Sequence, residues 1–233
     1  MVERKKLMFK DQLDAAAKLY DILPTQELIA KKPILLCSSL DSIIIADFIA
    51  KRLKLSYEIL FSEKIFAPQN SECIIAMVSE TEEIVMIEEL VEAFDISYDY
   101  IFGESFRKYE EKILKNIYKY RKGRSIESLK NRHILLIDDG CETGITALVC
   151  IKTTLGLDVK SISYATPMIA SDVLKSLKSV FDQIYAVNNI LNFVAVDFYY
   201  ENKIPFNPEE SIALLEESPY YLPLQKEGET HAV

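Results

Sequence analysis

Residues 134–146 read ILLIDDGCETGIT, and this stretch decides the fold. Its first four residues are apolar, which predicts a buried strand that runs directly into two adjacent carboxylates, Asp138 and Asp139. A short turn-forming segment follows at residues 140–144, and residues 145–149 begin a helical pattern. A buried strand that ends in paired acids, followed by a small loop and a helix N-terminus, forms a place that can hold a phosphorylated sugar.

On both sides of this stretch, expected strands alternate with expected helices. This alternation predicts an α/β fold with a mainly parallel sheet flanked by helices, in which ligands bind at the carboxyl ends of the strands. We expect one domain over residues 1–218 and a flexible tail over residues 219–233. The expected helices are residues 9–23, 42–53, 88–94, 106–120 and 171–177, and the expected core strands are residues 33–37, 57–61, 159–166 and 183–187. Residues 73–78 and 84–87 predict a hairpin, and residues 63–71 predict irregular chain.

The composition excludes several classes of function. The net charge of -9 argues against a general nucleic-acid-binding surface, which would be basic. The four cysteines form no CxxC pair, which disfavours a zinc site, and the apolar runs around three of them are typical of buried thiols rather than disulfides. No apolar stretch is long enough to cross a bilayer and the first residues have no secretory core, so the expected location is the cytoplasm.

The loop carries the chemistry of an anion site. Its successive N–H groups, at the start of a helix, suit a phosphate, and the hydroxyls of Thr143 and Thr146 can add hydrogen bonds. The two aspartates can accept from vicinal sugar hydroxyls, or can hold Mg²⁺ through water. Receiver domains also pair two acids after a strand, but near the start of a domain, and the chain has no P-loop pattern. A capped turn without a ligand is the remaining alternative.

The whole string resembles the phosphoribosyl-diphosphate (PRPP) signature of the type I phosphoribosyltransferases. The resemblance implies a parallel α/β fold with a small hood, Mg²⁺ as cofactor, and displacement of pyrophosphate from PRPP by a nitrogen nucleophile of a nucleobase-like acceptor. It implies that Asp138 and Asp139 bind the ribose hydroxyls and serve the metal. The implied PRPP-binding residues are Asp138, Asp139, Gly140, Cys141, Glu142, Thr143, Gly144, Ile145 and Thr146.

A second stretch supports this resemblance. Residues 64–76 read KIFAPQNSECIIA, which is similar to K-I-G-A-P-x-N-P-E-x-A-I-G in one uncharacterised bacterial branch of the family. Lys64 is then the expected catalytic partner of the departing pyrophosphate, because a flexible ammonium suits a leaving group that gains charge. Arg121 and Arg124 are either phosphate contacts or part of a solvated basic turn. A loop around residues 79–83 is expected to close over the site.

The sequence departs from that branch at two places. Asp41 and Ser42 stand where the branch has paired glycines that bind pyrophosphate, and a carboxylate there repels the ligand unless it caps a helix or acts through Mg²⁺. Glu142 replaces a small residue, and the hypoxanthine type of enzyme has an acid there. Glu142 is therefore either the general base that deprotonates the acceptor or an exposed loop acid. Cys141, inside the loop, either fills space there or is a reactive thiol whose pKa the helix N-terminus lowers. An aromatic cluster either stacks on the acceptor or belongs to the core: Phe193, Phe198, Tyr199 and Tyr200.

Two functions follow from these observations. The first is a PRPP- and Mg²⁺-dependent phosphoribosyltransferase, for which a homodimer is one expected assembly. The second is a non-catalytic regulatory protein of the same fold that binds a phosphoribosyl compound or a nucleotide. A plain α/β scaffold without a phosphoribosyl ligand is a third alternative. The Asp41–Ser42 departure is the feature that separates the first two.

Overall fold

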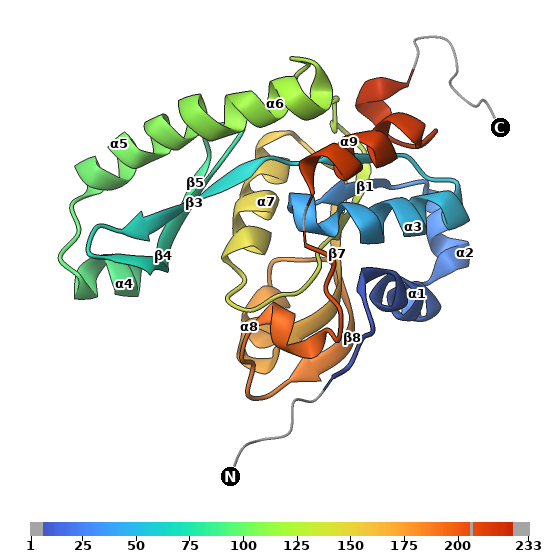
Figure 1. Cartoon of the computed structure of the whole chain (residues 1–233), viewed down its shortest axis with the longest axis horizontal. Helices are drawn as coiled ribbons and strands as arrows, with labels where there is room; N and C mark the ends of the chain where they lie inside the picture. The colour runs from blue at the N-terminus through green and yellow to red at the C-terminus, as the bar shows by residue number, and fades with distance from the viewer. Residues whose placement is uncertain (1–6, 206, 226–233) are drawn as a thin grey trace.

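A five-stranded parallel sheet forms the core of the structure, a computed structural model that describes residues 7–205 and 207–225 (Figure 1). The strand order is β2-β1-β6-β7-β8, and all neighbours are parallel. The fold class expected from the sequence is therefore confirmed. The strands are β1 Ile34–Cys37, β2 Tyr57–Ile59, β6 His133–Ile137, β7 Ser161–Ala170 and β8 Gln183–Ile190.

Helices cover both faces of this sheet, which explains why its central strands are apolar without alternation. In β1 and β6, Leu35 and Leu135 pack under α1 and α3, whereas Ile34 and Ile134 pack under α7 and α8. The helices are α1 Gln12–Ile22, α2 Thr25–Lys31, α3 Ile43–Leu53, α7 Ile145–Gly156 and α8 Ser171–Leu177. Among the described residues, no helix is both long and apolar enough to cross a membrane.

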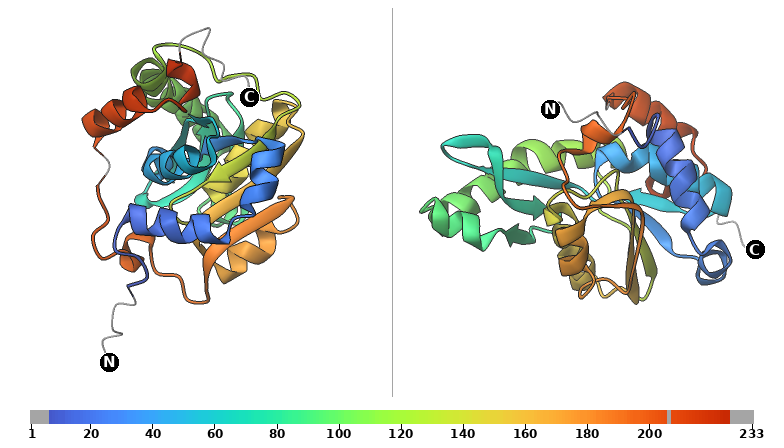
Figure 2. Two further views of the ribbon diagram at one scale, coloured as in Figure 1. Left: turned by 90° about the vertical axis from the view of Figure 1, so that its right-hand side faces the viewer. Right: turned by 90° about the horizontal axis from the view of Figure 1, so that it is seen from below.

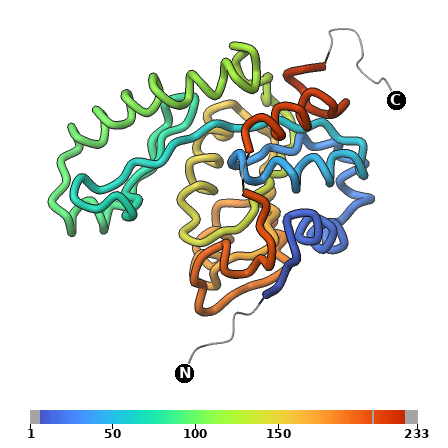
Figure 3. The backbone as a smooth tube through the Cα atoms, viewed as in Figure 1, coloured from blue at the N-terminus to red at the C-terminus, as the bar shows by residue number. Residues whose placement is uncertain are grey.

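A hood projects from one side of the core (Figures 1 and 2). Its antiparallel sheet has the order β3-β4-β5, and the chain passes through the whole hood between β2 and β6 (Figure 3). Residues 63–71, expected to be irregular, are mostly strand, because Ile65 and Ala67 are buried and the turn takes only two residues. The hairpin expected after it is confirmed. The hood elements are β3 Ser62–Ala67, β4 Asn70–Ser79, β5 Ile84–Met86, α4 Glu88–Ala93, α5 Tyr98–Lys108, a π-helical turn Tyr109–Ile113, and α6 Leu114–Arg121.

The C-terminal segment returns to the core. A 3-10 turn Val196–Tyr199 follows β8, and α9 Pro208–Glu217 follows with Asn207 as its N-cap. The tail expected from residue 219 is wrong as far as residue 225. Tyr221 is fully buried in the aromatic cluster with Tyr57, whose N–H donates to the carbonyl oxygen of Tyr220 at 2.8 Å. The rest of the expected tail, residues 226–233, lies outside the described residues.

Candidate functional site

A cavity of about 890 Å³ lies where the carboxyl ends of β1 and β6 face the hood. The core contributes residues 38–41 after β1 and residues 138–147 after β6. The hood contributes Lys64 on β3, among others, and the segment after β8 contributes residues 195–197 and Lys203. The edge of the sheet that the sequence indicated is therefore the edge that carries the cavity.

The loop after β6 is fixed by its backbone and its glycines. Cys141 donates its N–H to the carbonyl oxygen of Met168 at 2.9 Å, which ties the loop to β7. Gly144 has a φ of 78°, and a Cβ atom there would lie 2.7 Å from Cγ1 of Val173. A Cβ atom on Gly140 would lie 2.8 Å from Cγ2 of Val196. Both positions therefore require glycine.

The N-terminus of α7 forms one wall of the cavity. The first backbone hydrogen bond of this helix runs from the Leu148 N–H to the Gly144 carbonyl oxygen at 2.9 Å. The N–H groups of residues 145–147, which precede it, therefore have no partner within the helix. Glu142 and Thr143 are exposed beside them, and Thr146 is half-buried. All three line the cavity. N–H groups without a helical partner, hydroxyls and a helix N-terminus together suit a phosphate.

Asp138 is buried and its carboxylate is held by the protein itself. Oδ1 accepts the Ser38 hydroxyl at 2.8 Å and the Asp139 N–H at 2.9 Å, and Oδ2 accepts the Tyr164 hydroxyl at 2.6 Å. Burial raises the pKa of Asp138, and these hydrogen bonds oppose the rise. Sequence reasoning missed Ser38 and Tyr164, because Ser38 directly follows β1, Tyr164 lies on β7, and both meet Asp138 only when the sheet forms.

Asp139 is paired with a lysine that the sequence did not indicate. Lys203 Nζ lies 3.0 Å from Asp139 Oδ2 and 2.8 Å from Asp197 Oδ1. Burial and the neighbouring Asp138 raise the pKa of Asp139, and Lys203 opposes this rise. Burial lowers the pKa of Lys203, but attraction to Asp139 and Asp197 outweighs it and raises that pKa overall. The cavity therefore contains a positively charged group of the protein itself, the ammonium group of Lys203.

These contacts decide how Asp138 and Asp139 fit a metal. Both carboxylate oxygens of Asp138 accept protein donors, and Oδ2 of Asp139 is bound to Lys203. Within the described ranges, no group of three or more His, Cys, Asp or Glu side chains is arranged to hold a metal ion. The pair as it stands does not form a direct Mg²⁺ site.

The loop after β1 places only one of its two predicted residues at the cavity. Ser42 is fully buried and donates its hydroxyl to the Ser39 carbonyl oxygen at 2.8 Å, so the prediction that it contacts pyrophosphate is wrong. Ser38, Ser39 and Asp41 line the cavity instead. Asp41 lies in the 3-10 turn Leu40–Ser42 that precedes α3. Burial and the charge of Asp139 raise its pKa, and Lys203 and Lys64 oppose the rise.

The remaining predicted residues divide between the cavity and the core. Lys64 is exposed in the cavity wall. Cys141 is buried, and burial with the nearby charge of Asp138 raises the pKa of its thiol to about 12. Tyr199 and Tyr200 are buried in an aromatic cluster with Phe9 and Phe193. The four aromatic residues expected after β8 do not line the cavity, so the core alternative holds for them.

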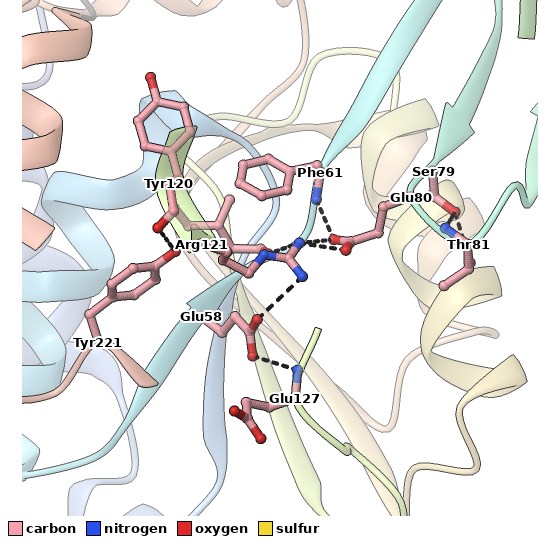
Figure 4. A network of polar contacts seen from close by, with 10 residues as sticks. Glu58, Phe61, Ser79, Glu80, Thr81, Tyr120, Arg121, Glu127 and Tyr221 are labelled. Atoms are coloured by element: carbon pink, nitrogen blue, oxygen red, sulfur yellow. Dashed lines mark hydrogen bonds and ion pairs between the residues drawn. The ribbon is translucent and has the colours of Figure 1, made fainter. Parts of the chain in front are cut away.

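Arg121 is part of a buried ion network at the junction of hood and core (Figure 4). Its Nη2 donates to both carboxylate oxygens of Glu80 and, at 3.3 Å, to the Ile59 carbonyl oxygen. Its Nη1 lies 3.6 Å from Oε1 of Glu58. Neither alternative expected for Arg121 therefore holds, since its side chain is fully buried and paired with protein carboxylates rather than solvated or turned to the cavity. Glu80 also accepts the Phe61 N–H at 2.9 Å, so the turn expected to close over the site is anchored.

Arg124 lies outside this network. It is exposed and donates to the Pro223 carbonyl oxygen at 3.3 Å. It does not line the cavity, which favours the alternative of a solvated basic turn.

Comparison with known proteins gives a likeness in structure only. No family model and no curated protein sequence matches the chain. The chain is similar to TT1426 from Thermus thermophilus, with a TM-score of 0.73, 24% identity, and coverage of 91% of this chain and 99% of that one. A hypothetical protein from Neisseria gonorrhoeae with bound ppGpp has a TM-score of 0.45 and 10% identity over 89% and 96% of the two chains. A purine phosphoribosyltransferase from Pyrococcus horikoshii has a TM-score of 0.46 and 12% identity over 82% and 92%. The likeness to TT1426 covers nearly the whole of both chains, so the two proteins share a fold: a parallel sheet with an antiparallel hood and a site loop after β6.

Proposed function

We propose that the protein transfers the 5-phosphoribosyl group of PRPP to a nitrogenous, nucleobase-like acceptor and releases pyrophosphate. The observation that carries the proposal is the single cavity wall formed by residues 138–147, with the α7 N-terminus at one end and the paired aspartates at the other. The 5′-phosphate would bind the N–H groups of residues 142–146. This phosphate anchor would fix the ribose so that C1 faces the hood.

In this proposal the two lysines of the cavity have different tasks. Lys64 is exposed on β3 and would stabilise the departing pyrophosphate as it gains charge. Lys203 would keep the charge of Asp139 balanced while the carboxylate accepts a ribose hydroxyl. Asp138, whose oxygens are already hydrogen-bonded, would position the Asp139 N–H and the loop rather than act on the ligand directly.

Glu142 is the proposed general base. Its carboxylate is exposed at the cavity wall and has no hydrogen-bond partner among the described residues, so it is free to accept a proton from the acceptor nitrogen. The variants Glu142→Gln and Glu142→Ala test this role. Unchanged turnover in both would assign Glu142 to the exposed loop surface instead.

Mg²⁺ belongs to the proposal as an ion that PRPP brings with it. Proteins of the phosphoribosyltransferase fold generally use Mg²⁺. Among the described residues, seven carboxylates but two lysines line the cavity, so a polyanionic ligand needs additional positive charge there. The ion would be held by oxygens of the ligand, because Asp138 and Asp139 are engaged by protein donors. A cytoplasmic location and a homodimer remain predictions from the sequence.

One observation favours the alternative of a non-catalytic phosphoribosyl or nucleotide sensor. Asp41 lines the cavity in the loop that should receive pyrophosphate, and its carboxylate would repel that part of PRPP. A ligand with a single phosphate, such as a nucleoside monophosphate, would avoid this repulsion. Its phosphate would use the same loop after β6.

Pyrophosphate release measured with PRPP, Mg²⁺ and a panel of nucleobase-like acceptors tests the proposal. Acceptor-dependent release that is lost in Lys64→Met supports transfer. Thermal stabilisation by PRPP or by nucleoside monophosphates, without release for any acceptor, supports the sensor. No stabilisation by either class of ligand would contradict both functions and leave a scaffold without this site.

A further inference from the structure

Lys203 occupies the acidic side of the cavity as a fixed cation. Its Nζ lies within 3.0 Å of a carboxylate oxygen of both Asp139 and Asp197, and its side chain is 19% exposed. Asp139 is itself buried at the start of the loop that follows β6. A divalent cation that coordinates Asp139 directly would have to take the place of this ammonium group.

The backbone around Lys203 is anchored on both sides, so the lysine is held in place rather than reaching in from a free loop. Asn202 donates its N–H to the Lys10 carbonyl oxygen at 2.8 Å. Ile204 is held by Gln12, which is buried: the Ile204 N–H donates to Oε1 of Gln12 at 2.9 Å, and Nε2 of Gln12 donates to the Ile204 carbonyl oxygen at 2.7 Å. Because the buried Gln12 side chain makes both of these hydrogen bonds to Ile204, it also fixes the position of Lys203, the preceding residue.

The cavity would attract metal ions without this lysine. Asp41, Asp139 and Asp197 line the same region, and oxygen ligands of this type are the ones that Mg²⁺ and Mn²⁺ prefer. The ammonium group neutralises part of that charge and uses Oδ2 of Asp139 and Oδ1 of Asp197. Two cations at one carboxylate oxygen would repel each other strongly at such short distances.

We propose that Lys203 is a specificity-determining residue that closes Asp139 to direct coordination by a divalent cation. Metal can then enter the cavity only when it is already bound to the phosphate oxygens of the ligand. The second statement rests on the proposed function, whereas the first concerns the protein without any ligand. Lys203 thereby makes metal binding depend on ligand binding.

Binding of Mn²⁺ to the full chain without ligand tests the first statement, because Mn²⁺ shares the oxygen preference of Mg²⁺ and free Mn²⁺ is measured directly by electron paramagnetic resonance. We expect Lys203→Met and Lys203→Gln to bind Mn²⁺ at least about tenfold more tightly than the wild type, because a positive charge beside Asp139 is removed. Adding Asp139→Asn should abolish the gain. Lys203→Arg keeps the cation and should behave as the wild type does.

Lys152→Met is the matched control for net charge, since Lys152 pairs with Glu83 and does not line the cavity. It should leave Mn²⁺ binding unchanged. The proposal is overturned if the wild type binds Mn²⁺ as tightly as both Lys203 variants, or if the gain survives Asp139→Asn. Since the assay contains no PRPP, a failure to release pyrophosphate would leave this result unaffected.

Discussion

The buried network at the hood junction predicts that Glu58 carries a proton at neutral pH. Arg121 and Glu58 are fully buried, Glu80 is nearly so, and full ionisation would leave one uncompensated negative charge. Glu80 holds the guanidinium group with both of its oxygens, whereas Oε1 of Glu58 has no hydrogen-bond partner among the described residues. Burial raises the pKa of Glu58 to about 8, although Arg121 and the Glu127 N–H oppose the rise.

This raised pKa has a definite effect on stability. The ordinary pKa of the group is 4.5, so between that value and about 8 the folded protein holds one proton more than the unfolded chain does. The free energy of unfolding therefore falls as pH rises through this window, and one proton contributes at most about 1.4 kcal/mol per pH unit. Below the ordinary pKa both states are protonated, and this contribution to stability is fully present.

Glu58→Gln tests this reasoning, because the amide resembles the protonated carboxyl group and does not titrate. Urea unfolding followed by circular dichroism, from about pH 5 to about pH 8, should give a variant whose stability falls less steeply with pH than that of the wild type. The two proteins should be closest in stability near about pH 5, and the variant should become the more stable one as pH rises toward about pH 8. Asp138 and Asp139 titrate in both proteins, so their effects cancel in the difference.

Glu127→Gln is the matched control, since its side chain is exposed and only its N–H contacts Glu58, at 3.1 Å. It should retain the pH dependence of the wild type. An unchanged slope in Glu58→Gln would refute the protonated state. A loss of about 3 kcal/mol or more at about pH 6 would also refute it, because Glu58 would then be an ionised partner of Arg121.

Two further predictions concern the loop after β6. Gly144→Ala should destabilise the protein by about 1–2 kcal/mol or more in urea unfolding, because φ is positive and Val173 leaves no room for a Cβ atom, whereas Gly103→Ala, in an open helical position, should not destabilise it. Cys141 should resist a thiol reagent in the native protein at about pH 8, because it is buried and burial raises the pKa of its thiol to about 12. Peptide mass spectrometry should therefore find the half-buried Cys73 labelled first. Early labelling of Cys141 would contradict the buried position of this residue in the loop.

The sequence predicted those parts of the molecule that depend on local pattern. Residues 134–137 are apolar without alternation because both faces of β6 are covered, and this signal is strong in a central parallel strand. The turn at Gly144 and the start of α7 follow from the same short segment. The prediction of a flexible tail from residue 219 was wrong because Tyr221 packs against Tyr57, which is far from it in the sequence.

The charged partners of the site and of the hood could not be predicted in this way. An arginine in a basic, turn-rich segment reads as solvated, yet Arg121 meets Glu58 and Glu80 once α6 returns to the core. Lys203 stands in a segment without periodicity and meets Asp139 only through the pairing of residues 201–202 with residues 9–10. In both cases the identity of the partner is a property of the tertiary structure.

Lys203 also changes what Asp41 means for the function. From the sequence, Asp41 is a repulsive charge in the pyrophosphate loop. In the structure it shares the cavity with Asp139, Asp197, Lys203 and Lys64, and both lysines oppose the rise in its pKa. Lys203 is already bound to two carboxylates, so of the described lysines that line the cavity only Lys64 remains to meet pyrophosphate. A ligand with one phosphate needs no more than the loop after β6, whereas PRPP needs the positive charge that Mg²⁺ brings. Mg²⁺ should therefore increase the affinity for PRPP far more than the affinity for a nucleoside monophosphate. The contact between the loop and the 5′-phosphate is the same for both ligands, so it should not depend on the ion.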